Sequence, residues 1–403
     1  MEAAANASSN AGAVTAESIV AQARTMMPRL RERAQRTEER RRIPAETHHE
    51  FIESGFYRIL QPARYGGFEL DYGTQTEMSV ELAMGCASSG WIASITACHA
   101  WIAGMFPPAV QERIWGDDAG TLIASAFQPP GDYRIERATG GWRVAGRWKF
   151  SSGVELCQWA VIATPIPAAD GKGPPERQFA LVPLDEAAIE DVWFVSGLAG
   201  TGSNDIVLRD VFIPDAHTLK ASECAGGPTP GSAINPCHIY RLPLFGVFPY
   251  NLVGVGIGAA IGAVELVIEQ LKVRSTATMH LRMAALQSAQ LRIARAAASA
   301  DAARVLIRTN CVEMNARARA GLPLGPEHRV RYRRDAGFAS LLFLEAVQGV
   351  FPLLGGGGLA AGNPIQRQWR DAHAVGQHIA CSWDAAGSHY GAAVLGVLPP
   401  EQM

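Results

Sequence analysis

The sequence predicts an α+β protein in which a β domain separates two helical regions. Apolar residues recur at helical spacing up to residue 120 and again after residue 237, whereas apolar and polar residues alternate in short runs between residues 121 and 221. A chain of 403 residues is long enough for such a multidomain fold. We therefore expect a disordered leader (1–15), an N-terminal helical domain (16–120), a central β-barrel domain (121–221), a linker (222–236) and a C-terminal four-helix bundle (237–403).

The first helical region is expected to hold five helices. The longest is amphipathic and rich in arginine, with Ile19, Ala23, Met26 and Leu30 on its apolar side. Pro44 opens the second, because proline fits the first turn of a helix. Pro-Pro and Gly-Gly pairs separate the others. The predicted ranges are 16–41, 45–54, 73–87, 90–105 and 109–115.

The middle and last regions differ in the length of their elements and in the residues that separate them. Short alternating runs between Gly- and Pro-rich turns predict strands near 122–127, 142–144, 159–166, 179–183 and 206–213. After a linker rich in Gly, Pro and Ser, four long helices are expected at 250–272, 279–320, 326–351 and 365–395. Residues 242–264 carry no charge and are long enough to cross a bilayer. Prolines, Asn251 and three glycines spaced by four favour a buried helix over a membrane span.

Composition excludes several kinds of partner. Charged residues make up 18% of the chain and the net charge is −2, so neither nucleic acid nor a membrane is expected as a partner. The seven cysteines form no CxxC pair and indicate reduced thiols in a cytoplasmic protein. Cys224, Cys237 and His238 lack a fourth ligand, so no metal site is expected. The N-terminus lacks the basic and apolar regions of a signal peptide.

A histidine-rich stretch, 363–391, follows the glycine run Gly355–Gly358. If it forms one helix, Asp371, His378 and His389 share a face with small alanine and serine side chains. Small residues beside histidines leave room for a bound planar molecule. The alternative is a set of histidines that cap neighbouring helices or face solvent.

Four motifs, in order along residues 43–396, resemble the acyl-CoA dehydrogenase fold. They are Phe51–Leu70, Gly146–Gly153, Leu198–Pro214 and the pair Arg370-Asp371. The resemblance implies a flavin between the β domain and the bundle, held partly by a neighbouring subunit of a homotetramer. Ordinary members place a glutamate base a few residues after the Arg-Asp pair, where this chain has Ile379.

The chemistry-bearing residues instead resemble the oxygenase components of two-component flavin-dependent monooxygenases, such as those acting on 4-hydroxyphenylacetate and secosteroid phenols. The resemblance lies in Ser89–Ser94 with His99 and Trp101, in Phe150–Gly153 with Cys157–Trp159, and in Asp371, His378 and Trp383–Ser388.

Membership of this family implies hydroxylation of a phenol, indole or polycyclic substrate by O2 through a C4a-hydroperoxyflavin. The cofactor would be reduced FMN or FAD, with FMN preferred. The bundle has no GxGxxG in a strand–turn–helix setting, so a separate NAD(P)H:flavin reductase is expected. An N- or S-oxygenating relative, an acyl-CoA dehydrogenase-like flavoprotein and a non-catalytic flavin-binding protein remain alternatives.

The same resemblance assigns roles to named residues. His378 is the expected base, since an unperturbed imidazole titrates near neutral pH, and Asp371 would orient it. Ser151 or Ser152 would accept a hydrogen bond from flavin N5–H. The other expected flavin contacts are Thr201, Ser203, Arg274, Ser275, Gly356 and Gly357. The substrate would be bound by His99, Ser125, Trp91, Tyr240 and Phe248, with Ser125 also a candidate for the flavin pocket.

Overall fold

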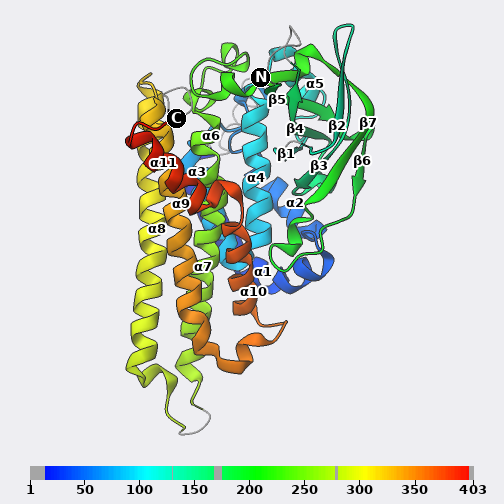
Figure 1. Cartoon of the computed structure of the whole chain (residues 1–403). Coiled ribbons are helices and arrows are strands. Elements are labelled where there is room, and N and C mark those ends of the chain that lie inside the picture. Colours follow the sequence, from blue (N-terminus) through cyan, green and yellow to red (C-terminus); the bar gives the residue numbers. More distant parts are fainter. Residues whose placement is uncertain (1–13, 129, 168–174, 277–279, 399–403) are drawn as a thin grey trace, which may run out of the picture.

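A computed structural model describes residues 14–128, 130–167, 175–276 and 280–398. The predicted leader lies outside these residues except for Val14 and Thr15. Figure 1 shows the long helices of the bundle side by side, with the β domain against one end of the assembly. The predicted α+β order of helices, strands and helices is confirmed.

The N-terminal region contains five helices close to their predicted ranges. They are α1 (Ala16–Arg40), α2 (Ala45–Glu53), α3 (Tyr72–Gly85), α4 (Ala87–Ala103) and α5 (Pro108–Trp115). Thr15 caps α1 by accepting a hydrogen bond from the Ser18 backbone N–H, while the Ser18 hydroxyl pairs back to Thr15. Every residue of α4 is buried, because α4 packs against the bundle helix α7 on one side and β1 on another. This helix therefore holds any side chain it carries in a fixed place.

The β domain consists of two four-stranded sheets. The first sheet has the order β1-β4-β5-β8, and the second has the order β2-β3-β7-β6. Their inner faces share one apolar core, so the predicted barrel takes the form of two packed sheets. The outer face of the first sheet belongs to the larger core that it forms with the helices. The strands are β1 (Ile123–Ala126), β2 (Tyr133–Ala138), β3 (Gly141–Ser151), β4 (Trp159–Ile166), β5 (Glu176–Pro183), β6 (Ala187–Glu190), β7 (Asn204–Pro214) and β8 (Thr218–Lys220).

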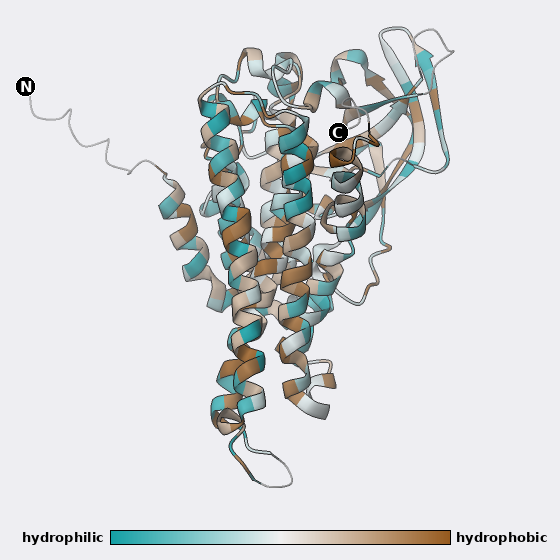
Figure 2. Ribbon diagram, turned by 60° about the vertical axis from the view of Figure 1, so that its left-hand side comes forward, coloured by the Kyte–Doolittle hydropathy of each residue, from teal (hydrophilic) through white to brown (hydrophobic). Residues whose placement is uncertain are grey.

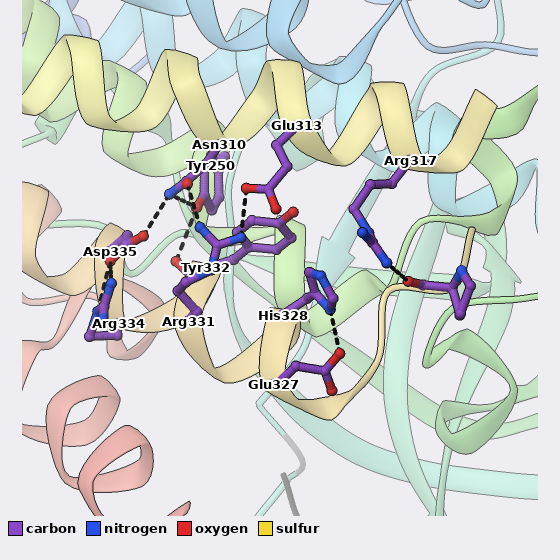
Figure 3. Close-up of polar contacts among 11 residues, drawn as sticks. Tyr250, Asn310, Glu313, Arg317, Glu327, His328, Arg331, Tyr332, Arg334 and Asp335 are labelled. Carbon is purple, nitrogen blue, oxygen red and sulfur yellow. Dashed lines mark hydrogen bonds and ion pairs between the residues drawn. The ribbon is translucent and has the colours of Figure 1, made fainter. Parts of the chain in front are cut away.

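The bundle is formed by α6 (Leu244–Val247), α7 (Pro249–Val273), α8 (Gln287–Arg319), α9 (Pro326–Val350), α10 (Pro364–Gly376) and α11 (Trp383–Val394). Figure 2 shows runs of apolar residues in the middle of its long helices. Polar contacts between these helices complete the packing (Figure 3). Asn310 on α8 donates to the Tyr250 hydroxyl at 3.0 Å and to Asp335 at 2.8 Å, which joins α7, α8 and α9.

The glycines of α7 explain its fit to α3. A Cβ on Gly258 would lie 2.3 Å from the backbone oxygen of Val80, and one on Gly262 would lie 2.4 Å from that of Met84. Two helical stretches, 244–273 and 326–359, are long and apolar enough to cross a membrane by composition. In the first, 78% of the apolar window is buried within the fold, as expected for the core helix predicted there.

The predicted helix over 365–395 is broken in two. α10 ends at Gly376, residues 379–381 form a 3-10 turn (η12), and α11 begins at Trp383. The side chain of His378 accepts from Ala380 N–H and that of Ser382 accepts from Ala385 N–H. These local bonds offer the backbone an alternative to continuous helix. The single face that would have joined Asp371, His378 and His389 therefore does not exist.

Candidate active site

The candidate site lies where the end of β3 meets the loop that precedes β7. The ladder between β3 and β7 shifts register between Trp148 and Ser151, and Phe150 takes a positive φ of 67°. The backbone N–H of Gly153 then donates to the Thr201 carbonyl at 2.9 Å. This turn buries Ser151 and Ser152 at the junction of β domain and helices.

A directed chain of hydrogen bonds crosses the junction. The Trp91 indole on α4 donates to Ser152 Oγ at 3.0 Å, Ser152 pairs with Ser203 at 2.8 Å, and Ser203 pairs with Thr201 at 2.7 Å. Thr201 donates to the Leu198 carbonyl at 2.8 Å. Because both ends are fixed, each hydroxyl must accept from the group before it and donate to the next. The structure thus brings together four of the predicted residues.

Ser151 differs from its neighbour. Its Oγ is buried and has no hydrogen-bond partner among the residues that the structure describes. Leaving a buried hydroxyl unpaired costs roughly 1–3 kcal/mol, so this atom is suited to a group that the polypeptide does not supply. Its place at the end of a strand, facing the junction, fits the predicted contact with flavin.

Asp371 supports the loop that contains Leu198. Its Oδ1 accepts from the Leu198 N–H at 2.7 Å, and among the described residues no hydrogen bond joins it to His378. Leu198 has a positive φ of 52°, so the carboxylate fixes a strained residue beside Thr201. Burial raises the pKa of Asp371 to about 6. The predicted role of Asp371 in orienting His378 stays a prediction.

His99 and Ser125 form a buried pair in which the histidine is fully engaged. His99 Nδ1 lies 2.8 Å from the Ile123 carbonyl, and its Nε2 lies 2.7 Å from Ser125 Oγ. A carbonyl only accepts, so Nδ1 carries the proton and Ser125 donates to Nε2. Burial lowers the pKa of His99 to about 4, which keeps the ring neutral. In this arrangement Ser125 keeps an accepting lone pair, whereas both ring nitrogens of His99 are engaged. Substrate binding by His99 stays a prediction.

His378 presents a donor to the same region. Its Nδ1 accepts from the Ala380 N–H at 3.1 Å, so a neutral ring carries its proton on Nε2. Burial lowers the pKa of His378 to about 4. A protonated Nε2 cannot accept a proton, so this geometry does not support the predicted base. It makes His378 a hydrogen-bond donor.

A series of ring contacts, which we call the wall, connects Trp91, His378, Phe248, Phe127 and His99. The His378 ring centroid lies 6.0 Å from that of Trp91 and 6.4 Å from that of Phe248. Phe127 closes the wall at 5.3 Å from Phe248 and 6.4 Å from His99. Phe127 was not predicted. It lies two residues after Ser125, and this spacing, which places both on one face of a strand, could have indicated it.

Comparison with known proteins identifies the family. The acyl-CoA dehydrogenase N-terminal domain matches residues 15–114, and the C-terminal domain of that family matches residues 250–383. The FADH(2)-dependent resorcinol hydroxylase, oxygenase component, of Rhizobium sp. (strain MTP-10005) is 37% identical over 93% of this chain and 93% of its own. The flavin-dependent monooxygenase, oxygenase subunit HsaA, of Rhodococcus jostii (strain RHA1) is 35% identical over 92% of this chain and 97% of its own. The crystal structure of the HsaA monooxygenase from M. tuberculosis superposes with a TM-score of 0.90 at 33% identity, covering 97% of this chain and 100% of that one. The chain belongs to the flavin-dependent monooxygenase oxygenase components.

Two groups of predicted residues lie outside the wall of this oxygenase component. Tyr240 is buried in the N-terminal core, where its hydroxyl donates to the Leu60 carbonyl at 3.0 Å. Its predicted substrate contact stays a prediction. Arg274 donates to the Leu354 carbonyl at 2.7 Å, beside the glycine run. Figure 1 shows the connections after α7 and α9 at the end of the bundle away from the β domain. Within one chain, the predicted flavin residues there do not join the site: Arg274, Ser275, Gly356 and Gly357.

Proposed function

We propose that this oxygenase component hydroxylates a phenol with O2 and reduced flavin. The observation that supports the proposal is that one acceptor, Ser125, and one donor, His378, are connected by ring contacts through Phe127 and Phe248. A phenolic hydroxyl group needs one of each. The names of relatives that act on resorcinol and on p-hydroxyphenylacetate support the same substrate class.

In the proposed mechanism, Ser125 accepts the substrate O–H and His378 donates from Nε2 to the same oxygen. His99 holds Ser125 in this orientation through its fixed tautomer. Both imidazoles stay neutral at physiological pH because burial lowers the pKa of each to about 4. The ring is therefore activated by polarising its hydroxyl group, without storing the proton on histidine.

The proposed flavin site uses Ser151 as the acceptor for N5–H, since Ser152 is already engaged with Trp91 and Ser203. When bound, the reduced flavin supplies the electrons and the activated oxygen. Reduced FMN is the proposed form, and reduced FAD is the alternative that the name of the Rhizobium relative favours.

We further propose a cytoplasmic homotetramer served by a separate NAD(P)H:flavin reductase. In it, the end of the bundle that carries Arg274, Ser275, Gly356 and Gly357 would bind the phosphate of a neighbouring subunit's flavin. A guanidinium fork is suited to that contact.

The wall supports the alternative functions less well than it supports phenol hydroxylation. An amine or thioether has no use for a donor and an acceptor aimed at one hydroxyl group, which disfavours N- and S-oxygenation. An acyl-CoA dehydrogenase needs a free carboxylate base, whereas Asp371 is committed to Leu198. A non-catalytic flavin-binding protein has no need of a substrate wall.

Product analysis tests the proposal. The protein is supplied with reduced FMN or FAD by a reductase and NADH, together with a panel of phenols, and products are identified by liquid chromatography and mass spectrometry. We expect catechol-type products, and we expect Ser151→Ala to divert oxygen to hydrogen peroxide while still consuming reduced flavin. Consumption of reduced flavin with no hydroxylated product from any phenol would refute the proposal.

A further inference from the structure

A row of phenylalanine side chains continues from the substrate wall toward solvent. The ring of Phe127 lies 5.3 Å from that of Phe248 and 5.3 Å from that of Phe179 on β5. Phe179 lies 6.0 Å from Phe245 on α6. Since Phe245 is 40% exposed, the row joins the buried site to the surface.

The register of the first sheet places Arg177 at the outer end of this row. Ser125 on β1 stands opposite Val161 on β4, and Val161 stands opposite Leu181 on β5. Side chains two residues apart share a face, so Leu181, Phe179 and Arg177 follow one another outward along β5. Arg177 therefore lies on the face that carries Ser125.

The guanidinium of Arg177 is held in place but has no counter-charge. Its Nη2 donates to the Phe127 carbonyl at 3.0 Å, and its central carbon lies 5.0 Å from the Phe245 ring and 5.9 Å from the Phe179 ring. Among the described residues it forms no ion pair with a carboxylate. The residue is exposed, so an anion can reach the guanidinium from solvent. A guanidinium that is held in place without a counter-charge can bind a carboxylate through charge-assisted hydrogen bonds.

We propose that Arg177 binds an anionic substituent of the substrate, so that the enzyme prefers a phenol carrying a short carboxylic acid side chain. The proposal rests on the function proposed above. Ser125 and His378 hold the hydroxyl end, the phenylalanine row packs against the ring, and the guanidinium fork receives the carboxylate. The Phe127 carbonyl lies roughly 7 Å along the strand from Ser125, at about 3.3 Å per residue, which suits a small aromatic acid.

The test compares two probes of the same shape, 4-hydroxyphenylacetate and its neutral amide. Binding to the full-length protein is measured by calorimetry, and hydroxylation is measured with reductase and NADH. We expect the acid to bind at least about tenfold more tightly than the amide, as for a charge-assisted hydrogen bond. Arg177→Gln should abolish that ratio by weakening the binding of the acid much more than that of the amide, and Arg177→Lys should restore part of it.

Arg209→Gln is the matched control, because Arg209 on β7 of the second sheet is also exposed and forms no ion pair among the described residues. It should leave the ratio unchanged. Equal binding of acid and amide by the unaltered protein would overturn the inference, as would equal weakening of both by Arg177→Gln. A retained binding ratio with no hydroxylation of either probe would support the anion site and count against the proposed function.

Discussion

Replacing His378 by asparagine distinguishes a hydrogen-bond donor from a base. Burial lowers the pKa of His378 from 6.5 to about 4, so the protein disfavours the imidazolium by about 3 kcal/mol. Moving a proton from a phenol with a pKa near 10 to such a ring would be uphill by roughly 8 kcal/mol. A donor role carries no such cost. Asparagine keeps an oxygen that can accept from the Ala380 N–H and an N–H that can donate, but it cannot act as a base.

We therefore expect His378→Asn to retain kcat/KM within about tenfold of the unaltered enzyme and His378→Ala to lose about a hundredfold or more, as is usual for a lost transition-state contact. The pH profile of kcat/KM should show no break near pH 6.5 caused by this ring. Thermal unfolding of both variants checks that the turn at η12 is intact. The reasoning is refuted if both variants lose activity equally and a break near pH 6.5 in the unaltered enzyme disappears with them.

The remaining predictions concern stability. Ser151→Ala should leave the thermal midpoint unchanged or raised, because it removes a buried hydroxyl that has no hydrogen-bond partner among the described residues. Ser152→Ala should lower the free energy of unfolding by roughly 1–3 kcal/mol, because Trp91 and Ser203 each lose a hydrogen bond. Equal effects of the two substitutions would contradict this reasoning. The raised pKa of Asp371, about 6, means that the ionised carboxylate destabilises the fold increasingly as pH rises from about 4 to 6. Asp371→Asn should thus stabilise the protein by about 3 kcal/mol more at pH 8 than at pH 4 in denaturant titrations, and a pH-independent difference would exclude that cause. Gly258→Ala should destabilise the protein by about 1–3 kcal/mol, because the added Cβ would lie 2.3 Å from a backbone oxygen. The control Gly349→Ala should not destabilise it, because nothing in the described part of the chain lies within 4 Å of the added Cβ. Similar losses of stability in both variants would refute the packing argument.

Local patterns were sufficient to predict the fold because they depend on residues close in sequence. Helical spacing located α7 and α9 to within a residue or two. Alternation located β1, β4, β5, β7 and part of β3, but it missed β2, β6 and β8. The break at His378 was missed because it depends on one side chain bonding to a nearby N–H in competition with the helix. Ser152 and Ser203, both predicted as flavin contacts, and Trp91, predicted as a substrate contact, lie far apart in the chain and are joined by hydrogen bonds in the structure.

What the sequence could not provide was the direction of each hydrogen bond. His378 was predicted as a base and His99 as a substrate contact, but the role proposed for each depends on which ring nitrogen carries the proton. The Ile123 carbonyl fixes one tautomer of His99, and the Ala380 N–H fixes the opposite tautomer of His378. Both partners are backbone groups, so the residue types in the sequence do not indicate these hydrogen bonds. The sequence is equally silent on Tyr240, since an aromatic residue packs equally well in a core or a pocket.

Among the described residues, two of the six non-glycine residues that take a positive φ lie where the flavin is proposed to bind. Phe150 and Leu198 both take a positive φ although neither is glycine, and each conformation costs roughly 1–3 kcal/mol. The strain at Leu198 is maintained by Asp371, whose burial is itself unfavourable, and the strain at Phe150 accompanies a register shift in the sheet. The two distortions act together. One turns Ser151 inward with an unpaired hydroxyl, and the other brings Thr201 and Ser203 against Ser152. A fold optimised only for stability would have relaxed both, so their persistence side by side is best explained by a ligand that pairs with Ser151.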